Sequence, residues 1–179
     1  MVDTTLKENI NNLPFRLMFQ DEAGFGRMSQ PKSCWAPYPA RPMVAVALVR
    51  EFRYICATVS PWDGRLSYSI TEKMNTENMN IHLSQVSKRF KYSFNVIIVD
   101  GASSHRSKDL IIPKNIGLIQ LPPYSPELNP AEQIWRLLRG QYFANKIFNS
   151  LDDAIVQVKK GLLPRRIIMI IYFFIDFTL

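Results

Sequence analysis

The sequence predicts an α/β fold in which a mixed β-sheet is flanked by helices. Two largely apolar segments, 15–20 and 94–99, have the composition of buried strands. Each is followed directly by an aspartate, Asp21 and Asp100. Along the chain, several strands precede one helix, and a strand ending at Asp100 precedes another strand and then further helices. This order indicates helices packed on a sheet.

The region between the two aspartates is predicted to be rich in strands. We expect three strands here, at 43–49, 54–60 and 65–70. The first two would be joined by a charged turn at 50–53, and the third follows the turn-forming sequence Trp62-Asp63-Gly64. The preceding segment, 24–42, contains several prolines and is expected to be a loop that contacts a ligand.

Helices and one more strand complete the predicted fold. A helix should run from about residue 75 to 88, where Asn75 or Thr76 can cap it. Its apolar stripe consists of Met79, Leu83 and Val86. A strand at 116–120 leads through a proline-rich loop to a helix whose first turn carries Glu132. The last helix should begin near Ser150, where the sequence resembles a capping box.

The two aspartates are expected to lie at the same edge and on the same face of the sheet. Side chains alternate between faces along a strand. Asp21 continues the row Phe15, Leu17 and Phe19, and Asp100 continues the row Phe94, Val96 and Ile98. If the two strands are parallel neighbours, both carboxylates meet at the carboxyl end of the sheet, where α/β proteins place their chemistry.

Each carboxylate also has an alternative interpretation. Asp100 precedes a glycine, and Asp-Gly is a common turn sequence. Glu132 stands three residues after Asn129, so that it could close a capping box instead of binding a metal. Glu22 is adjacent to Asp21 but would face the other side of the sheet.

Two motifs resemble the catalytic core of DDE superfamily transposases and endonucleases. They are DGASSH, beginning at Asp100, and LPPYSPELNPAEQIW, beginning at Leu121. With FRLMFQDE at 15–22, they are most similar to bacterial insertion-sequence transposases related to mariner. The resemblance covers residues 15–161. It implies an RNase H-like, retroviral integrase-like fold, whose catalytic and metal-binding residues would be Asp21, Asp100 and Glu132.

This resemblance implies cutting and rejoining of DNA, with water and then a DNA 3′-hydroxyl as the nucleophile. Three clustered carboxylates suit Mg²⁺, which prefers oxygen ligands; two ions are expected, and Mn²⁺ should substitute. His105, Arg136 and Arg139 would contact DNA or orient a metal ligand. Trp135 is expected to be a core residue. Two rival functions are a metal-dependent nuclease without strand transfer, and an inactive or accessory DNA-binding remnant of a mobile element.

The implied partner is double-stranded DNA, both element ends and target, with a dimer assembled on it. Lys and Arg outnumber Asp and Glu by 22 to 15, and the resulting net charge of +7 favours a polyanion. We also expect a helix-turn-helix DNA-binding half to be required, because relatives carry one upstream of the segment corresponding to Phe15.

The chain of 179 residues fits one domain, which we place at 15–161. The segment 1–14 is polar and unlike a signal peptide, and 162–179 is an atypical apolar tail. This tail is too short to span a bilayer, and is expected to be a frame-shifted or truncated end, or else a buried strand. Cys34 and Cys56 are expected to be free thiols. We therefore expect no membrane association and a bacterial cytoplasmic, nucleoid-associated location.

Overall fold

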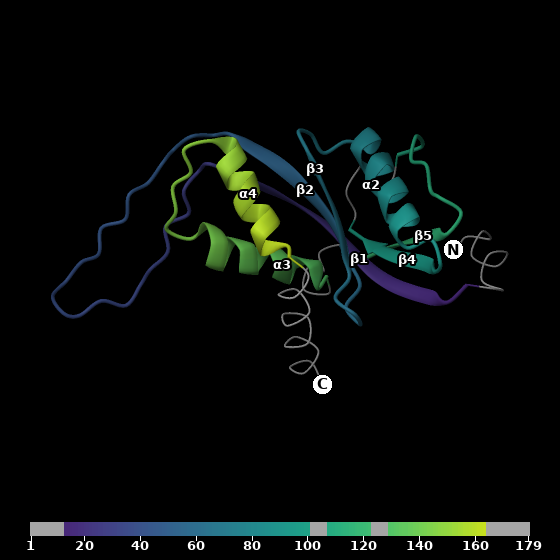
Figure 1. The fold of residues 1–179 in the computed structure, drawn as a ribbon, viewed down its shortest axis with the longest axis horizontal. Coiled ribbons are helices and arrows are strands. Elements are labelled where there is room, and N and C mark those ends of the chain that lie inside the picture. The colour runs from purple at the N-terminus through teal and green to yellow at the C-terminus, as the bar shows by residue number, and fades with distance from the viewer. Residues whose placement is uncertain (1–12, 101–106, 123–128, 164–179) are drawn as a thin grey trace.

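The strands of the protein form one mixed sheet in the order β3-β2-β1-β4-β5 (Figure 1). The computed structural model describes residues 13–100, 107–122 and 129–163. Within them the strands are β1 (Phe15–Gly26), β2 (Phe52–Val59), β3 (Leu66–Thr71), β4 (Phe94–Val99) and β5 (Ile116–Gln120). Strands β1, β4 and β5 run parallel, whereas β2 and β3 are antiparallel to their neighbours. The predicted mixed sheet is confirmed.

Strand β1 is longer than predicted, because it has a different partner along each half. Residues 15–19 pair with β4, and from Phe19 to Gly26 the strand pairs with β2. The segment 24–26, predicted to be part of a loop, therefore belongs to the strand. Asp21 lies within β1 rather than after its end, two residues beyond the last pair with β4.

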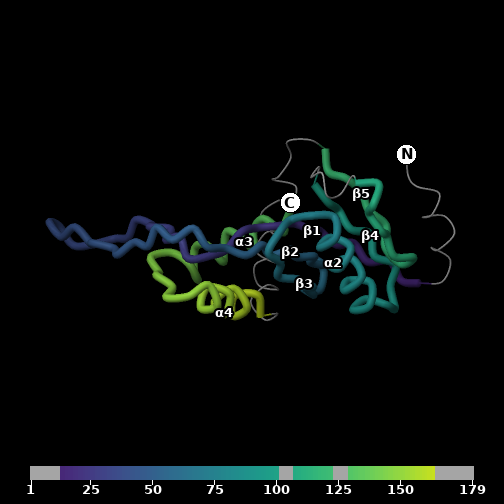
Figure 2. The backbone as a smooth tube through the Cα atoms, turned by 90° about the horizontal axis from the view of Figure 1, so that it is seen from above, coloured from purple at the N-terminus to yellow at the C-terminus, as the bar shows by residue number. Residues whose placement is uncertain are grey.

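The predicted strand at 43–49 is wrong. Residues 27–51 instead form an extended arm that projects from the end of the sheet, as Figures 1 and 2 both show. At its base, the Arg27 N–H donates to the Glu51 carbonyl and the Ser29 N–H to the Ala47 carbonyl. Met43 is 98% exposed. Strand propensity reflects packing on a pleated surface, and within the described part of the chain residues 43–49 are not paired in the sheet. The predicted turn at 50–53 is also wrong, because β2 begins at Phe52.

Helix α2 (Thr76–Arg89) packs on one face of the sheet. Its stripe of Met79, Leu83 and Val86 is buried, as predicted, and the Asn75 side chain caps its first turn. The stripe also contains His82, whose ring nitrogens lie 2.7 Å from the Thr58 hydroxyl and 3.0 Å from the Ser69 hydroxyl. These contacts satisfy a fully buried imidazole, so that it can occupy a core position.

The opposite face is covered by the C-terminal helices. They are α3 (Ala131–Leu137), the π-helical turn η3 (Leu138–Phe143) and α4 (Leu151–Gly161). The capping box predicted at Ser150 is confirmed, since its hydroxyl accepts from the Asp153 N–H and the Asp153 carboxylate accepts from the Ser150 N–H. Trp135 is the largest fully buried side chain of this core among the described residues.

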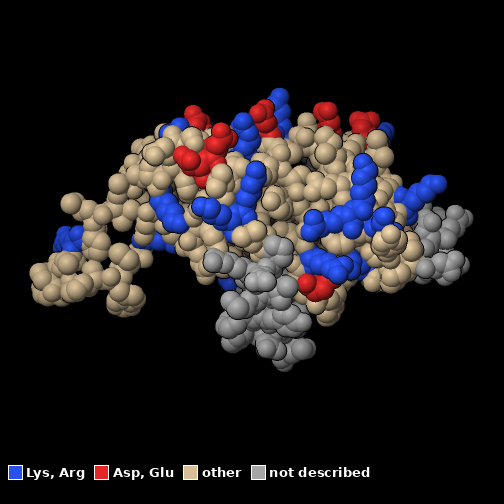
Figure 3. Space-filling view, viewed as in Figure 1, with Lys and Arg blue, Asp and Glu red and all other residues tan. Residues whose placement is uncertain are grey.

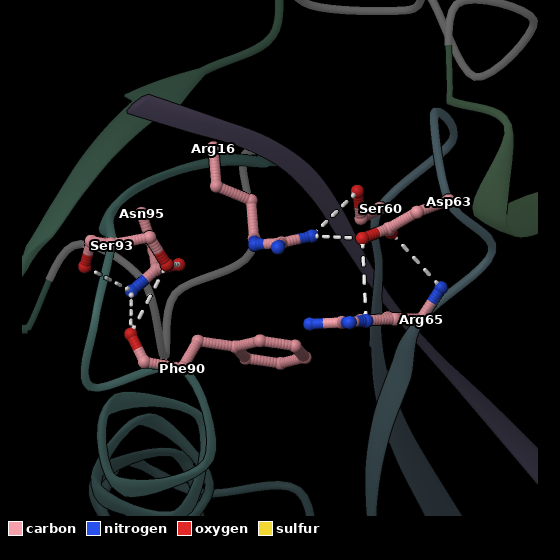
Figure 4. Close-up of polar contacts among 7 residues, drawn as sticks. All are labelled: Arg16, Ser60, Asp63, Arg65, Phe90, Ser93 and Asn95. Atoms are coloured by element: carbon pink, nitrogen blue, oxygen red, sulfur yellow. Dashed lines mark hydrogen bonds and ion pairs between the residues drawn. The ribbon is translucent and has the colours of Figure 1, made fainter. Parts of the chain in front are cut away.

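A polar cluster fixes the amino-terminal end of β1 (Figure 4). The Arg16 guanidinium donates to Asp63 at 2.6 Å and to the Ser60 hydroxyl at 3.3 Å, and it lies 5.1 Å from the centre of the Phe90 ring. Arg65 also pairs with Asp63, at 3.5 Å. These contacts connect the start of β1, the β2–β3 turn and the end of α2, at the end of the sheet away from Asp21.

The predictions for the two ends of the chain lie outside the described residues. They concern the segment 1–12 and most of the apolar tail, 164–179. Within the described part of the chain, no helix has the length and apolar character required to cross a membrane.

Candidate active site

The register of the two parallel strands places Asp21 beside Asp100. The β1–β4 pairs run from Phe15 with Phe94 to Phe19 with Ile98, and each aspartate follows two residues after the last pair. Both therefore stand at the carboxyl end of the parallel strands, as the sequence predicted. Asp21 is only 8% exposed, whereas Asp100 is exposed.

Helix α3 brings Glu132 to the same place. Pro130 precedes the helix, and Glu132 lies in its first turn, half-buried. Two hydrogen bonds join this region to β1: the Asn129 side-chain amide donates to the Gln20 carbonyl at 3.0 Å, and the Trp135 Nε1 donates to Asp21 Oδ2 at 2.8 Å. Asn129 and Trp135 thus join the helix to two consecutive residues of β1, Gln20 and Asp21.

The capping interpretation of Glu132 receives no support. The Asn129 side-chain oxygen accepts from the Ala131 N–H at 3.1 Å, so that the polar contact at the helix start comes from Asn129. Among the described residues, the Asn129 N–H makes no hydrogen bond to the Glu132 carboxylate. The carboxylate of Glu132 therefore has no observed role in capping.

The pKa of Asp21 is influenced by both of the other carboxylates. Burial raises the pKa of Asp21 from its ordinary 3.8 to about 7, and the negative charge of Glu132 adds to this rise. Hydrogen bonds from the Glu22 N–H and the Trp135 indole lower the pKa in part, and Asp100 raises it further. The ionised form of Asp21 is thus disfavoured first by burial and then by its two acidic neighbours.

Glu22 is directed away from this group. Its Oε1 accepts from the Gln20 side-chain amide at 3.3 Å, and that amide also lies 3.2 Å from the Cys56 sulfur on the α2 side of the sheet. Alternation along β1 therefore directs Glu22 and Asp21 to opposite faces of the sheet.

The other predicted residues have varied positions. Arg139 lies with its guanidinium carbon 5.4 Å from the centre of the Phe25 ring, which gives it a packing contact. Arg136 is exposed on the same helical segment. His105 lies outside the described residues.

Trp135 is the functional feature that the sequence interpretation missed. It was expected only to fill the core, yet its indole nitrogen hydrogen-bonds Asp21. One signal in the sequence could have indicated this: Trp135 follows Glu132 by three residues and so lies on the same helix face. A buried indole N–H also requires an acceptor, and the nearby aspartate provides one.

The carboxylates suit a divalent cation in their chemistry. Within residues 13–100, 107–122 and 129–163, no three His, Cys, Asp or Glu side chains are grouped closely enough to hold a metal as they stand. Asp21 nevertheless experiences the charge of both Glu132 and Asp100. Oxygen ligands with net negative charge are those that Mg²⁺ and Mn²⁺ prefer, and a cation would relieve the repulsion among them.

Basic side chains are numerous on the surface. Figure 3 shows Lys and Arg gathered across the middle of one face, whereas most of the visible Asp and Glu lie along its upper rim. The excess of basic residues in the sequence agrees with this view.

The sheet order, the mixture of parallel and antiparallel pairs and the helices on both faces define an RNase H-like fold of the transposase and integrase class. The chain belongs to the family of DDE superfamily endonucleases, whose model matches residues 16–155.

Solved structures share this fold at low sequence identity. The Mos1 mariner paired-end complex with Mn matches 88% of this chain and 52% of the Mos1 chain, with a TM-score of 0.66 and 16% identity. The Mos1 strand transfer complex matches 88% of this chain and 50% of that one, with a TM-score of 0.65 and 14% identity. The HTLV-2 integrase catalytic core domain in complex with magnesium has a TM-score of 0.50 and 14% identity, over 84% of this chain and 85% of that domain. The chain thus spans about half the length of the Mos1 transposase chains.

A relative in Sinorhizobium fredii, the uncharacterized protein y4pE/y4sA, is 36% identical over 103 residues. This alignment covers 57% of the present chain and 76% of the relative.

Proposed function

We propose that this chain is the catalytic domain of a bacterial insertion-sequence transposase, which cuts DNA and joins the cut end to a target. The observation that carries the proposal is the β1–β4 register, which puts Asp21 beside Asp100 while α3 holds Glu132 within electrostatic range of Asp21. Membership of the DDE endonuclease family supports hydrolysis of phosphodiester bonds. Joining of the cut DNA end to a target goes beyond hydrolysis and is the more specific part of the proposal.

In this proposal the three carboxylates hold two Mg²⁺ ions, for which Mn²⁺ can substitute. Such ions, when bound, supply positive charge to the phosphodiester oxygens on which negative charge develops. The chain's own contribution is to keep the carboxylate oxygens together on a rigid support. Two of them come from adjacent strands, and the third comes from a helix hydrogen-bonded to one of those strands.

The proposed substrate is double-stranded DNA, both at the ends of the element and at the target. The net charge of +7 supports it, because Lys and Arg gain affinity for DNA when counterions leave the phosphates. We assign phosphate contacts to Arg136 and Arg139, and also to His105 in the segment after Asp100. Binding as a dimer, cooperation with a helix-turn-helix half and a place at the bacterial nucleoid belong to the same proposal.

The proposal is tested by the variant Glu132→Gln. We expect it to fold with a melting temperature close to that of the parent and to lose nearly all Mn²⁺-dependent cleavage, because a neutral amide is a poor ligand for a divalent cation. The assay uses radiolabelled element-end DNA, with a DNA-binding half supplied in trans. The matched control is Glu22→Gln, which makes the same chemical change on the other face of the sheet and should retain cleavage.

Pre-cut DNA ends separate the transposase from a nuclease that only hydrolyses. A transposase joins a pre-cut 3′-hydroxyl end to a target plasmid, which yields a larger product on a gel. Cleavage without that product would favour the simple nuclease. Cleavage by Glu132→Gln at the rate of the parent would remove Glu132 from the site.

A further inference from the structure

The buried indole of Trp135 makes a polar contact that core packing does not require. Its side chain is 1% exposed and lies against Phe25, with ring centres 5.8 Å apart. Its single polar atom, Nε1, donates a hydrogen bond of 2.8 Å to Asp21 Oδ2. A phenylalanine would fill most of the same volume without this bond, so that packing and hydrogen bonding can be separated.

The Asp21 carboxylate is held from two directions. The backbone N–H of Glu22 donates to Oδ1 at 2.9 Å, and the indole donates to Oδ2. One contact comes from the strand itself and the other from helix α3, so that both the rotation and the tilt of the carboxylate are restricted. Each carboxylate oxygen can accept about two hydrogen bonds or ligands, so that each retains capacity for a cation.

The same helix carries Glu132. Asn129 anchors its start on the Gln20 carbonyl, and Trp135 anchors its second turn on Asp21. Glu132 lies between these two anchors in the sequence. A change in the Trp135 contact therefore affects two carboxylates at once: it releases Asp21, and it loosens the helix that presents Glu132.

We propose that Trp135 is a positioning residue for metal binding, which fixes the Asp21 carboxylate relative to Glu132 through its indole N–H. This inference rests on the proposed function, because it assumes that the cation binds at these carboxylates. Groups that hold metal ligands in place commonly change affinity by about 10-fold to 100-fold when they are removed. The loss of one hydrogen bond from Trp135 should therefore weaken Mn²⁺ binding by about tenfold.

The test compares Trp135→Phe with Phe25→Leu in the full chain without DNA. Mn²⁺ binding is measured by electron paramagnetic resonance of the free ion, and stability by thermal denaturation. Trp135→Phe should bind Mn²⁺ about tenfold more weakly than the parent. Phe25→Leu disturbs the packing of Trp135 but leaves its N–H in place, so that it should lose stability and keep the parent's affinity.

A second measurement requires no folded variant at position 135. In a ¹H–¹⁵N spectrum of the parent, the indole signal of Trp135 should shift and saturate as Mg²⁺ is added. The signals of Trp35 and Trp62, which are largely exposed, should stay in place and serve as internal controls. They are assigned from Trp35→Phe and Trp62→Phe, which identify the third signal by elimination.

The outcomes separate this inference from the proposed function. A parent protein that binds no Mn²⁺ refutes the metal site, and with it both proposals. A parent that binds Mn²⁺ while Trp135→Phe binds equally well, or while Phe25→Leu loses the same affinity, refutes only the positioning role. An indole signal that does not move while Mg²⁺ binding saturates also refutes it.

Discussion

Replacement of Asp21 by asparagine should stabilise the metal-free protein at pH 8, although it removes a proposed metal ligand. The pKa of this carboxyl is raised from 3.8 to about 7, first by burial and then by the charge of Glu132. At pH 8 this carboxyl is therefore mostly ionised in the folded protein, although its buried surroundings disfavour the charge. Asparagine has the same shape and carries no charge, so that this cost disappears.

The magnitude follows from the size of the shift. About three pKa units at about 1.4 kcal/mol each amount to about 4 kcal/mol. Asparagine can orient its oxygen toward only one of the two donors that contact Asp21, the Glu22 N–H and the Trp135 indole, and the lost hydrogen bond costs about 1 kcal/mol. The net gain should be about 2 to 3 kcal/mol, which for a chain of this size raises the melting temperature by roughly 5–10 °C.

The stability gained by Asp21→Asn should depend on pH. Because the folded pKa lies above the unfolded one, the folded state binds the proton more tightly, and the parent loses stability as pH rises from about 4 through about 7. Asp21→Asn should not show this loss. Its advantage over the parent should therefore be absent near pH 4 and largest near pH 8.

The assay is thermal denaturation in EDTA across this pH range, with Gly161→Ala as a variant that changes packing but no titrating group. If Asp21→Asn is destabilised equally at pH 4 and pH 8, Asp21 carries no excess charge cost and our account of the site is wrong. Addition of Mg²⁺ at pH 8 should stabilise the parent and leave Asp21→Asn unchanged. This result would show that the cation offsets the free-energy cost of the ionised Asp21 carboxylate.

Further predictions concern the metal, the core and the DNA. Asp100→Asn should abolish weak Mn²⁺ binding measured by calorimetry, whereas Glu22→Gln should retain it. Equal loss of binding in both variants would mean that the metal does not bind at the proposed carboxylates. Gly161→Ala should lower the free energy of unfolding by about 1 to 3 kcal/mol in urea denaturation, because a methyl group there would overlap Leu138 and approach Tyr142. Gly140→Ala, which faces only the end of the Lys32 side chain at 3.4 Å, should cost clearly less. Binding to non-specific DNA, measured by fluorescence anisotropy, should weaken steeply as salt rises, and an affinity that is flat with salt would contradict DNA as the partner.

The sequence predicted which face of the sheet each aspartate occupies, because strand periodicity is a local property; that the two strands are parallel neighbours was an assumption, which the structure confirms. The rows Phe15, Leu17, Phe19 and Phe94, Val96, Ile98 each place the following aspartate on a defined face, and the parallel register then aligns them. The cap of α2 and the capping box at Ser150 were predicted for the same reason, since such caps involve residues only three positions apart.

The failures involve partners that are distant in the sequence. The segment 43–49 has the composition of a strand, but whether a strand forms depends on a neighbour along its whole length. In the arm 27–51 the described hydrogen bonds between its two sides, from Arg27 to Glu51 and from Ser29 to Ala47, lie only at its base. The hydrogen bond between Trp135 and Asp21 joins residues more than a hundred positions apart. Helix periodicity places Trp135 on the same face as Glu132 and so near the site, but it does not by itself identify Asp21 as the acceptor for the indole.

The division of β1 between two partners determines when the site can assemble during synthesis. The antiparallel half, with β2 and β3, uses neighbouring parts of the chain and can form while later residues are still on the ribosome. The parallel half must wait for β4, and α3 emerges later still. Contacts between distant segments form slowly, so that the carboxylates should meet only at the end of folding. A nascent chain thus carries Asp21 on an already paired strand, but the site stays incomplete until β4 has paired and α3 has docked.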